Sequence, residues 1–154
     1  MRIFFKTHIL SVYAEFELQM IAVIIEKMQD HISEFLNKKT IAVVGATNRP
    51  GRFGYIIFRN LLDRGYNVLP VHPILKTIDG HKVYSSLTDI PEKIDAVDFV
   101  VTPAVTEKVV EECARLGIRL VWMQPGAESR AAIDFCEQNG IACIHGTCVL
   151  IHHA

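Results

Sequence analysis

The pattern of apolar positions predicts five short strands in this chain. Apolar runs, interrupted only by Asp98, occupy residues 41–44, 68–71, 96–101, 120–123 and 141–144. Runs without polar alternation are typical of strands buried on both faces, as in a parallel sheet covered by helices on either side. Three of these runs follow a helical pattern that ends at a glycine, namely Gly65, Gly117 or Gly140. Glycine adopts the left-handed conformation that ends helices, so each of the three marks a predicted helix end.

Between the strands, apolar residues recur at the three- and four-residue spacing of amphipathic helices. One stripe consists of Ile57, Phe58, Leu61 and Leu62, and another of Val105, Val109, Val110, Cys113 and Ala114. Alternating strands and helices joined by right-handed crossovers predict an α/β fold. We therefore expect a single Rossmann-like domain with a doubly wound, five-stranded parallel sheet. Residues 72–95 depart from the alternation, because their prolines and glycine leave room only for a short turn at 86–90.

The first 37 residues are interpreted as an N-terminal extension, and residues 38–154 as the globular domain. Apolar residues at helical spacing predict an amphipathic helix over about 20–37. Residues 1–19 are apolar but interrupted by Lys6 and Glu15. They contain neither the roughly 20 apolar residues of a membrane span nor the small-residue cleavage site of a signal peptide. Their place in the fold, and in the native chain, stays open.

Composition narrows the class of protein. Of the 154 residues, 50% are hydrophobic and 21% are charged, which suits a packed core and not a disordered chain. A formal net charge of −1 provides no general attraction to nucleic acid or to acidic membranes. The four cysteines lack any C-x-x-C spacing, which favours reduced thiols in the cytoplasm. His145, Cys148, His152 and His153 match no common structural zinc spacing, so no metal is expected.

The loop after the first strand carries the candidate chemistry. In doubly wound sheets, ligands bind at the carboxyl ends of the strands, beside the first strand. The helix that follows this loop can hold a diphosphate on its free amide groups. The expected contacts are Gly45, Ala46, Thr47, Asn48, Arg49, Arg52, Phe53 and Gly54, with Gly45 leaving room for the diphosphate. The spacing matches neither G-x-G-x-x-G nor G-x-x-x-x-G-K-[ST], so a turn without a ligand is the alternative.

The end of the second strand selects among nucleotides. Sites for NAD place a carboxylate there to bind the ribose hydroxyl groups. This chain has His72 and Pro73, and no acid before Asp79. His72 and Lys76 suit a phosphate on the ribose, which leaves NADP or coenzyme A. A loop histidine held by its neighbouring prolines is the alternative for His72.

Taken together, these segments resemble the small stand-alone CoA-binding proteins of Rossmann type. That family is similar to the CoA-binding domains of succinyl-CoA synthetase alpha subunits and of ADP-forming acyl-CoA synthetases. The matching residues are 41–48, Pro50, Gly54, 71–73, Gly80, Lys82, Tyr84, 86–87, 90–91, 121–124 and Cys148. The resemblance covers about residues 38–152. Two departures are Thr47, where the family usually has Ser, and Ile74, where it usually has Lys, so that the lysine is displaced to Lys76 or lost.

The resemblance implies a protein that binds coenzyme A or an acyl-CoA through the ADP moiety and has no catalytic residues of its own. Adenine and ribose are then expected between 72–73 and Thr102–Pro103. Gln124, Gly126 and Cys148 are expected along the pantetheine arm, and Trp122 in the core. An NADP-dependent oxidoreductase is one alternative, although no substrate domain is evident. A CoA-ligase subunit acting with a partner chain is the other, although no second ligase domain or phosphohistidine loop is evident. A protein partner or a homo-oligomer also stays open.

Overall fold

The computed structural model describes residues 2–153, with side chains from residue 11 onward. Its main sheet consists of the strands β1 (Thr40–Val44), β2 (Asn67–Val71), β5 (Ala96–Phe99), β6 (Leu120–Met123) and β7 (Ala142–Ile144). All neighbours in it are parallel, in the order β2-β1-β5-β6-β7. The chain runs from β1 to one edge and then crosses to the other side, so the switch point lies between β1 and β5. This is the predicted Rossmann-like, five-stranded parallel sheet.

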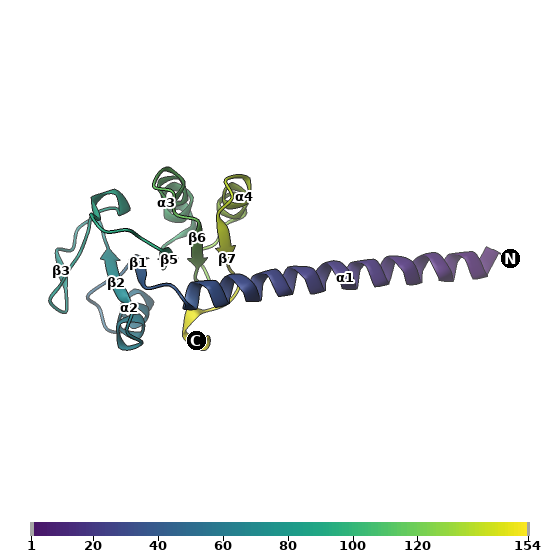
Figure 1. Ribbon diagram of the computed structural model, residues 1–154, viewed down its shortest axis with the longest axis horizontal. Coiled ribbons are helices and arrows are strands. Elements are labelled where there is room, and N and C mark those ends of the chain that lie inside the picture. The colour runs from purple at the N-terminus through teal and green to yellow at the C-terminus, as the bar shows by residue number, and fades with distance from the viewer. Residues whose placement is uncertain (1, 154) are drawn as a thin grey trace.

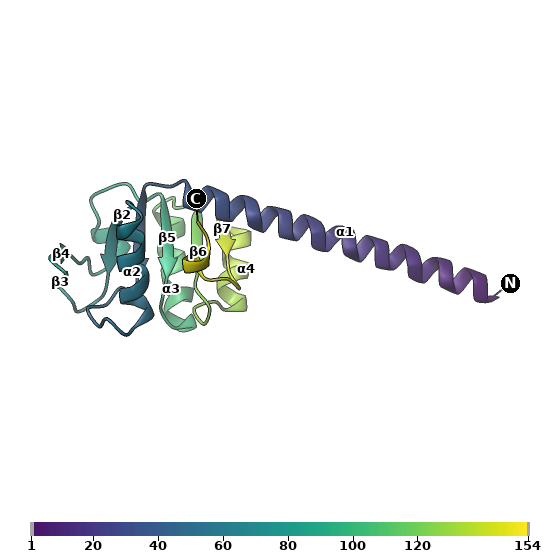
Figure 2. The same cartoon turned by 90° about the horizontal axis from the view of Figure 1, so that it is seen from below.

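Helices cover both faces of the sheet (Figures 1 and 2). The helix α2 (Phe53–Asp63) lies on one face, whereas α3 (Pro103–Arg115) and α4 (Arg130–Gln138) lie on the other. A short 3₁₀ turn, η2 (Val149–Ile151), contacts α2 on its side of the sheet. The glycines predicted to end helices all have positive φ. The layers therefore follow the predicted pattern.

The connection from β2 to β5 contains no α-helix, as predicted, but it does contain an unexpected hairpin. The strands β3 (Thr77–Ile78) and β4 (His81–Lys82) pair antiparallel, and the turn η1 (Leu87–Asp89) follows within the predicted segment 86–90. The hairpin is tied to α2, because the Tyr55 hydroxyl donates to Asp79 over 2.8 Å. The rings of Phe58 and His81 also meet edge to face. Only tertiary contacts of this kind hold two-residue strands, which explains why local sequence did not predict them.

The strand predicted over 96–101 ends early, at Phe99. Val100 still donates its N–H to Val44, over 2.8 Å. The chain then turns away toward α3, which begins at Pro103. Val100 and Val101 are therefore left at the carboxyl edge of the sheet, beside the loop that follows β1.

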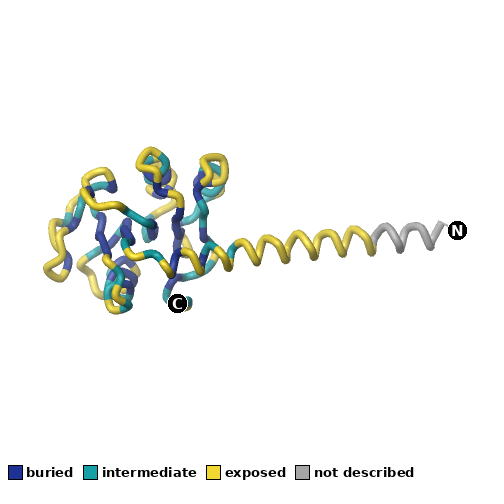
Figure 3. The backbone as a smooth tube through the Cα atoms, viewed as in Figure 1, coloured by how far each residue is buried: buried dark blue, intermediate teal, exposed yellow. Residues whose placement is uncertain are grey.

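The N-terminal helix α1 (Arg2–Leu36) is much longer than the predicted segment 20–37. Only its last turns pack on the domain, where Ile32, Phe35 and Leu36 are buried. The rest projects away from the sheet as a single straight helix (Figures 1 and 3). Within residues 2–153, no helix combines the length and the apolar character needed to cross a membrane.

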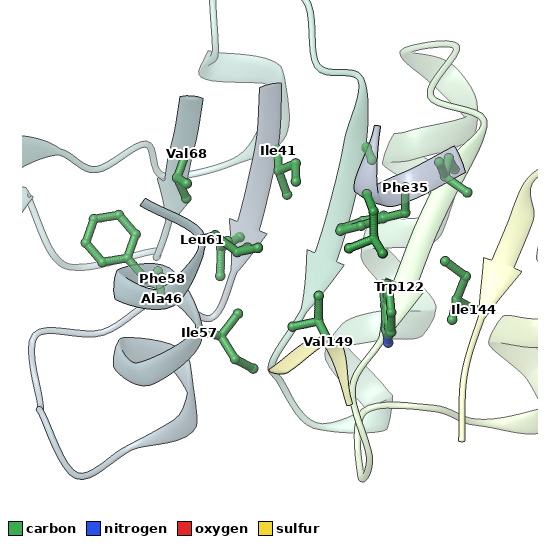
Figure 4. Close-up of a cluster of buried hydrophobic side chains, with 14 of the residues drawn as sticks. Phe35, Ile41, Ala46, Ile57, Phe58, Leu61, Val68, Trp122, Ile144 and Val149 are labelled. Atoms are coloured by element: carbon green, nitrogen blue, oxygen red, sulfur yellow. The ribbon is translucent and has the colours of Figure 1, made fainter. Parts of the chain in front are cut away.

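Two hydrophobic clusters, one on each face of the sheet, form the core. Figure 4 shows the cluster beneath α2 and the end of α1, with Trp122 near its centre. Trp122 is fully buried, as predicted, and its ring meets Phe35 edge to face at 5.0 Å. Its indole N–H donates to the Thr147 carbonyl, so the buried polar atom is satisfied and the C-terminal segment is attached to β6.

Candidate functional site

Two glycines shape the loop between β1 and α2 through packing. A Cβ on Gly45 would lie 2.2 Å from the Val100 carbonyl oxygen, and φ at Gly45 is +93°. A Cβ on Gly54 would lie 2.1 Å from the Gly45 carbonyl oxygen. Both glycines thus allow α2 to start against the ends of β1 and β5. The expected reason for Gly45 was wrong, because its missing side chain would point at the Val100 backbone just after β5 and not into space for a diphosphate.

The start of α2 offers hydrogen-bond donors. The N–H groups of Tyr55 and Ile56 donate to the Arg52 carbonyl. In the described part of the chain, the N–H groups of Phe53 and Gly54 have no acceptor, as is usual for the first turn of a helix. The partial positive charge of the helix end adds to these donors, so the position suits an anion.

The first cavity, of about 550 Å³, lies over the ends of β1, β2 and β5. Five of the predicted residues line it: Gly45, Thr47, His72, Pro73 and Thr102. The other lining residues are Val44, Val71, Ser85, Ser86, Leu87, Val100, Val101, Val105, Val109 and Glu112. As expected, the residues that follow β2 and those that follow β5 therefore lie on the same cavity.

The second cavity, of about 390 Å³, lies over the ends of β5 and β6 beside the start of α2. Four of the predicted residues line it: Phe53, Gln124, Gly126 and Cys148. Ile57, Pro125 and Ala127 complete its wall, together with Val100 and Val101. Since Val100 and Val101 also line the first cavity, the two adjoin along the carboxyl edge of the sheet. We call the pair the carboxyl-edge groove.

The imidazole of His72 is oriented by its own loop. Its Nδ1 accepts the N–H groups of Ile74 and Leu75, each over 3.2 Å. The same nitrogen cannot also carry a proton, so the proton of the neutral ring lies on Nε2. His72 can therefore donate one hydrogen bond from Nε2 without gaining charge.

Several other predicted residues lie outside both cavities. Asn48, Arg49 and Arg52 are exposed on the loop, and among residues 11–153 neither arginine side chain has an ion-pair or hydrogen-bond partner. Lys76 is exposed next to the β3–β4 hairpin. Ala46 is fully buried in the core cluster, which leaves only its backbone for a ligand. Pro103 is the first residue of α3. The lining residues Thr102, Gln124 and Cys148 come from three other segments.

Sequence reasoning missed the two serines of the groove. Ser85 and Ser86 follow Tyr84, whose N–H donates to the Pro70 carbonyl and whose carbonyl accepts the His72 N–H. This isolated bridge places the serines beside the end of β2. Ser86 entered only through the family resemblance, and the local sequence does not show this contact, because it depends on a partner more than ten residues away.

A buried carboxylate beneath the groove was also missed. Asp98 is fully buried in the middle of β5, and both of its oxygens accept from Gln124 Nε2, over 3.0 and 3.2 Å. Burial raises the pKa of Asp98 to about 7, although the Gln124 hydrogen bond opposes this shift. The Gln124 Oε1 in turn accepts the Val149 N–H over 3.1 Å. Gln124 therefore joins Asp98 to the C-terminal segment.

The C-terminal segment that carries Cys148 is held from α2 as well. The Arg64 guanidinium donates to the carbonyls of Leu150 and His152 over 3.2 and 2.7 Å. The His152 ring bonds to the Thr147 hydroxyl over 2.8 Å. Among the described residues, no group of three or more histidines, cysteines or acids could hold a metal ion. Cys148 of this segment lines the second cavity of the groove.

A family model described as a CoA binding domain matches residues 39–154. The chain belongs to this CoA-binding family. It is 32% identical over 124 residues to the uncharacterized protein YneT of Bacillus subtilis (strain 168), covering 80% of the chain and 92% of YneT. The structure is similar to that of a conserved hypothetical protein from Pyrococcus furiosus, with a TM-score of 0.71 and 38% identity. That match covers 74% of this chain and 98% of the other.

The same domain occurs in larger enzymes. The chain is 36% identical over 98 residues to the acetate–CoA ligase [ADP-forming] I subunit alpha of Pyrococcus furiosus (strain ATCC 43587 / DSM 3638 / JCM 8422 / Vc1). The match covers 58% of this chain but only 21% of the ligase subunit. The chain therefore spans about a fifth of that relative. The resemblance inferred from sequence, to small stand-alone CoA-binding proteins related to ADP-forming ligases, is confirmed.

Proposed function

We propose that this protein binds coenzyme A or an acyl-CoA through the ADP moiety, in the carboxyl-edge groove, without chemistry of its own. The observation that carries the proposal is the pair of adjoining cavities on the two sides of the β5 exit. Coenzyme A is an elongated molecule with a nucleotide at one end and a thiol arm at the other. A bipartite groove with a helix start beside it suits that shape.

The larger cavity would hold the adenosine end. Ser85, Ser86 and Thr102 supply hydroxyl groups for the adenine and ribose. The ribose phosphate would lie toward His72 Nε2 and not toward Glu112, which also lines this cavity and accepts from the Thr88 N–H. The Glu112 carboxylate repels phosphate, which favours the orientation of the nucleotide that brings its phosphate to His72.

The diphosphate would lie at the start of α2. The Phe53 and Gly54 amides provide donors there, and the exposed loop provides Arg49 and Arg52 as nearby charges. Both arginine side chains have freedom to reach a ligand, because within residues 11–153 neither is held by an ion pair. This arrangement predicts a contact that salt weakens.

The smaller cavity would hold the pantetheine arm. Phe53, Ile57 and Pro125 give it a largely apolar wall, and Gln124 adds an amide. Cys148 lies on the same wall, so the thiol end of the ligand would lie near the Cys148 Sγ. Acyl groups attached to the ligand thiol would then be held at this end of the groove.

A thermal-shift panel tests the ligand class. Coenzyme A, acetyl-CoA, NADP, NAD and ATP are each added at equal, saturating concentration. A ligand at about 100 times its Kd adds about 2.7 kcal/mol to the free energy of unfolding. We expect coenzyme A and acetyl-CoA to raise Tm most. A larger shift with NADP than with coenzyme A would instead support the oxidoreductase alternative.

A thiol assay tests the absence of chemistry. The protein is incubated with acetyl-CoA, and free thiol is followed with a disulfide reagent after correction for the protein's own cysteines. We expect release at the rate of buffer alone. Release that scales with protein concentration would contradict a purely binding role.

A further inference from the structure

The projecting part of α1 exposes an unusual amount of apolar surface. Nine large apolar side chains between residues 12 and 25 are each between 51% and 66% exposed. They are Val12, Tyr13, Phe16, Leu18, Met20, Ile21, Val23, Ile24 and Ile25. Figure 3 shows this stretch as a continuous exposed helix beyond the domain. A contiguous apolar surface of this kind on a protein marks an interaction site.

One row of these residues continues the row that anchors the helix. Ile32 is buried against the core, and Met28 packs against its edge. Ile25, Ile21 and Leu18 extend the same row at alternating spacings of three and four residues. This spacing is that of helices that pair with other helices along their length. The row thus has a partner at its domain end and none, among the described residues, along its projecting part.

The polar side of the same stretch is acidic. Glu15, Gln19, Glu26 and Asp30 share one side of the helix, and Lys27 is the one lysine of residues 11–33. Helices that lie on membrane surfaces usually carry several Lys or Arg on the polar side, where anionic headgroups attract them. An acidic side is repelled by those headgroups, so a lipid surface is a poor occupant.

We propose that the projecting part of α1 is a self-association surface, and that it packs against α1 of a second copy of this chain. A row with regular spacing on one copy meets the same row on another, as a two-fold interface requires. Leu18, Ile21 and Ile25, with Ile24 beside them, would bury about 100 Å² each, which is roughly 400 Å² per copy. The projecting row thus accounts for about half of the roughly 800 Å² that each partner buries in a standard interface.

A cavity at the base of the projecting segment extends this surface onto the domain. It measures about 540 Å³ and lies between α1, α4 and the edge strand β7. Ile24, Met28, Ile133 and Ile141 give it apolar walls. A helix from a second copy that lies along α1 would meet this cavity at its end, so the proposed interface does not stop where the domain begins.

Sedimentation equilibrium of the full chain tests the proposal. The chain mass is 17.3 kDa. We expect a mass of at least two chains at micromolar concentration. The double variant Ile21→Glu with Ile25→Glu should sediment as one chain, and Ile21→Ala with Ile25→Ala should raise the dissociation constant at least tenfold. The control Gln19→Glu with Ser33→Glu adds the same charge at two exposed positions on the polar side and should leave the mass unchanged.

Thermal unfolding checks that each variant is folded. The substituted side chains lie outside the core, so we expect every variant to unfold cooperatively. A wild-type mass of one chain would overturn the proposal. So would a charged double variant that remains associated, or a control that dissociates equally. Flotation of the wild-type chain with vesicles of phosphatidylcholine and phosphatidylserine would also overturn it, in favour of a lipid surface.

Discussion

The packing of the loop after β1 predicts a stability loss from the smallest substitution at Gly54. In Gly54→Ala, the new methyl carbon would lie 2.1 Å from the Gly45 carbonyl oxygen. A carbon and an oxygen normally approach no closer than about 3.3 Å, so α2 or the end of β1 must move by about 1 Å. Overpacking costs about 1–3 kcal/mol, whereas alanine gains about 1 kcal/mol over glycine inside a helix. Because the neighbour is backbone, we expect a net loss of about 2 kcal/mol.

Gly51→Ala is the matched control three residues earlier in the chain. A Cβ at Gly51 meets nothing within 4 Å. Its free energy of unfolding should change by no more than about 0.5 kcal/mol. Urea unfolding of both variants, followed by tryptophan fluorescence and far-ultraviolet circular dichroism, gives the comparison. A Gly54→Ala protein as stable as the wild type would refute this account of the loop, as would an equal loss in Gly51→Ala.

Three further predictions concern charge. Because burial raises the pKa of Asp98 from 3.8 to about 7, the folded protein keeps a proton that the unfolded chain releases above about pH 4. The free energy of unfolding should fall as pH rises from 4 to 7, and an unchanged slope in Asp98→Asn would contradict this. Removing the 3′-phosphate of coenzyme A should weaken binding, measured by calorimetry, about ten- to a hundredfold. His72→Ala should abolish most of the difference between the two ligands. Equal affinities of the wild type for both ligands would exclude His72 as the phosphate contact. Arg52→Ala should weaken coenzyme A binding more at low salt than at high salt. The control Arg115→Ala, at the C-terminal end of α3, should leave the affinity unchanged. A loss of affinity in Arg52→Ala that does not depend on salt would count against the charge contact.

Hydrophobic periodicity predicted the sheet because burial on both faces leaves a strong signal. Each of the five long strands lies within two residues of the predicted run. The β3–β4 hairpin gave no such signal, since Tyr55 and Phe58 hold it from another element. The length of α1 was missed for the opposite reason. A helix exposed on most sides has no burial pattern from which periodicity can locate its start.

The candidate site was predictable where it follows the strand ends. Parallel strands bring their carboxyl ends to one edge, so Gly45, His72, Thr102 and Gln124 were expected near each other, and they line the groove. The burial of Asp98 was not predicted, because an acid is almost never fully buried without a partner and the local sequence offers none. Its partner, Gln124, lies 26 residues away in sequence.

Amide chemical shifts during a titration with coenzyme A test the central claim most directly. We predict that the largest changes occur in the carboxyl-edge groove, at Gly45, Gly54 and Gly126, and saturate at one ligand per chain. The cavity beside α1 is a rival site, because its volume of about 540 Å³ is close to the 550 Å³ of the first cavity of the groove; Gly140 and Cys143 line it. Shifts concentrated at Gly140 and Cys143, with the groove amides unmoved, would contradict the account.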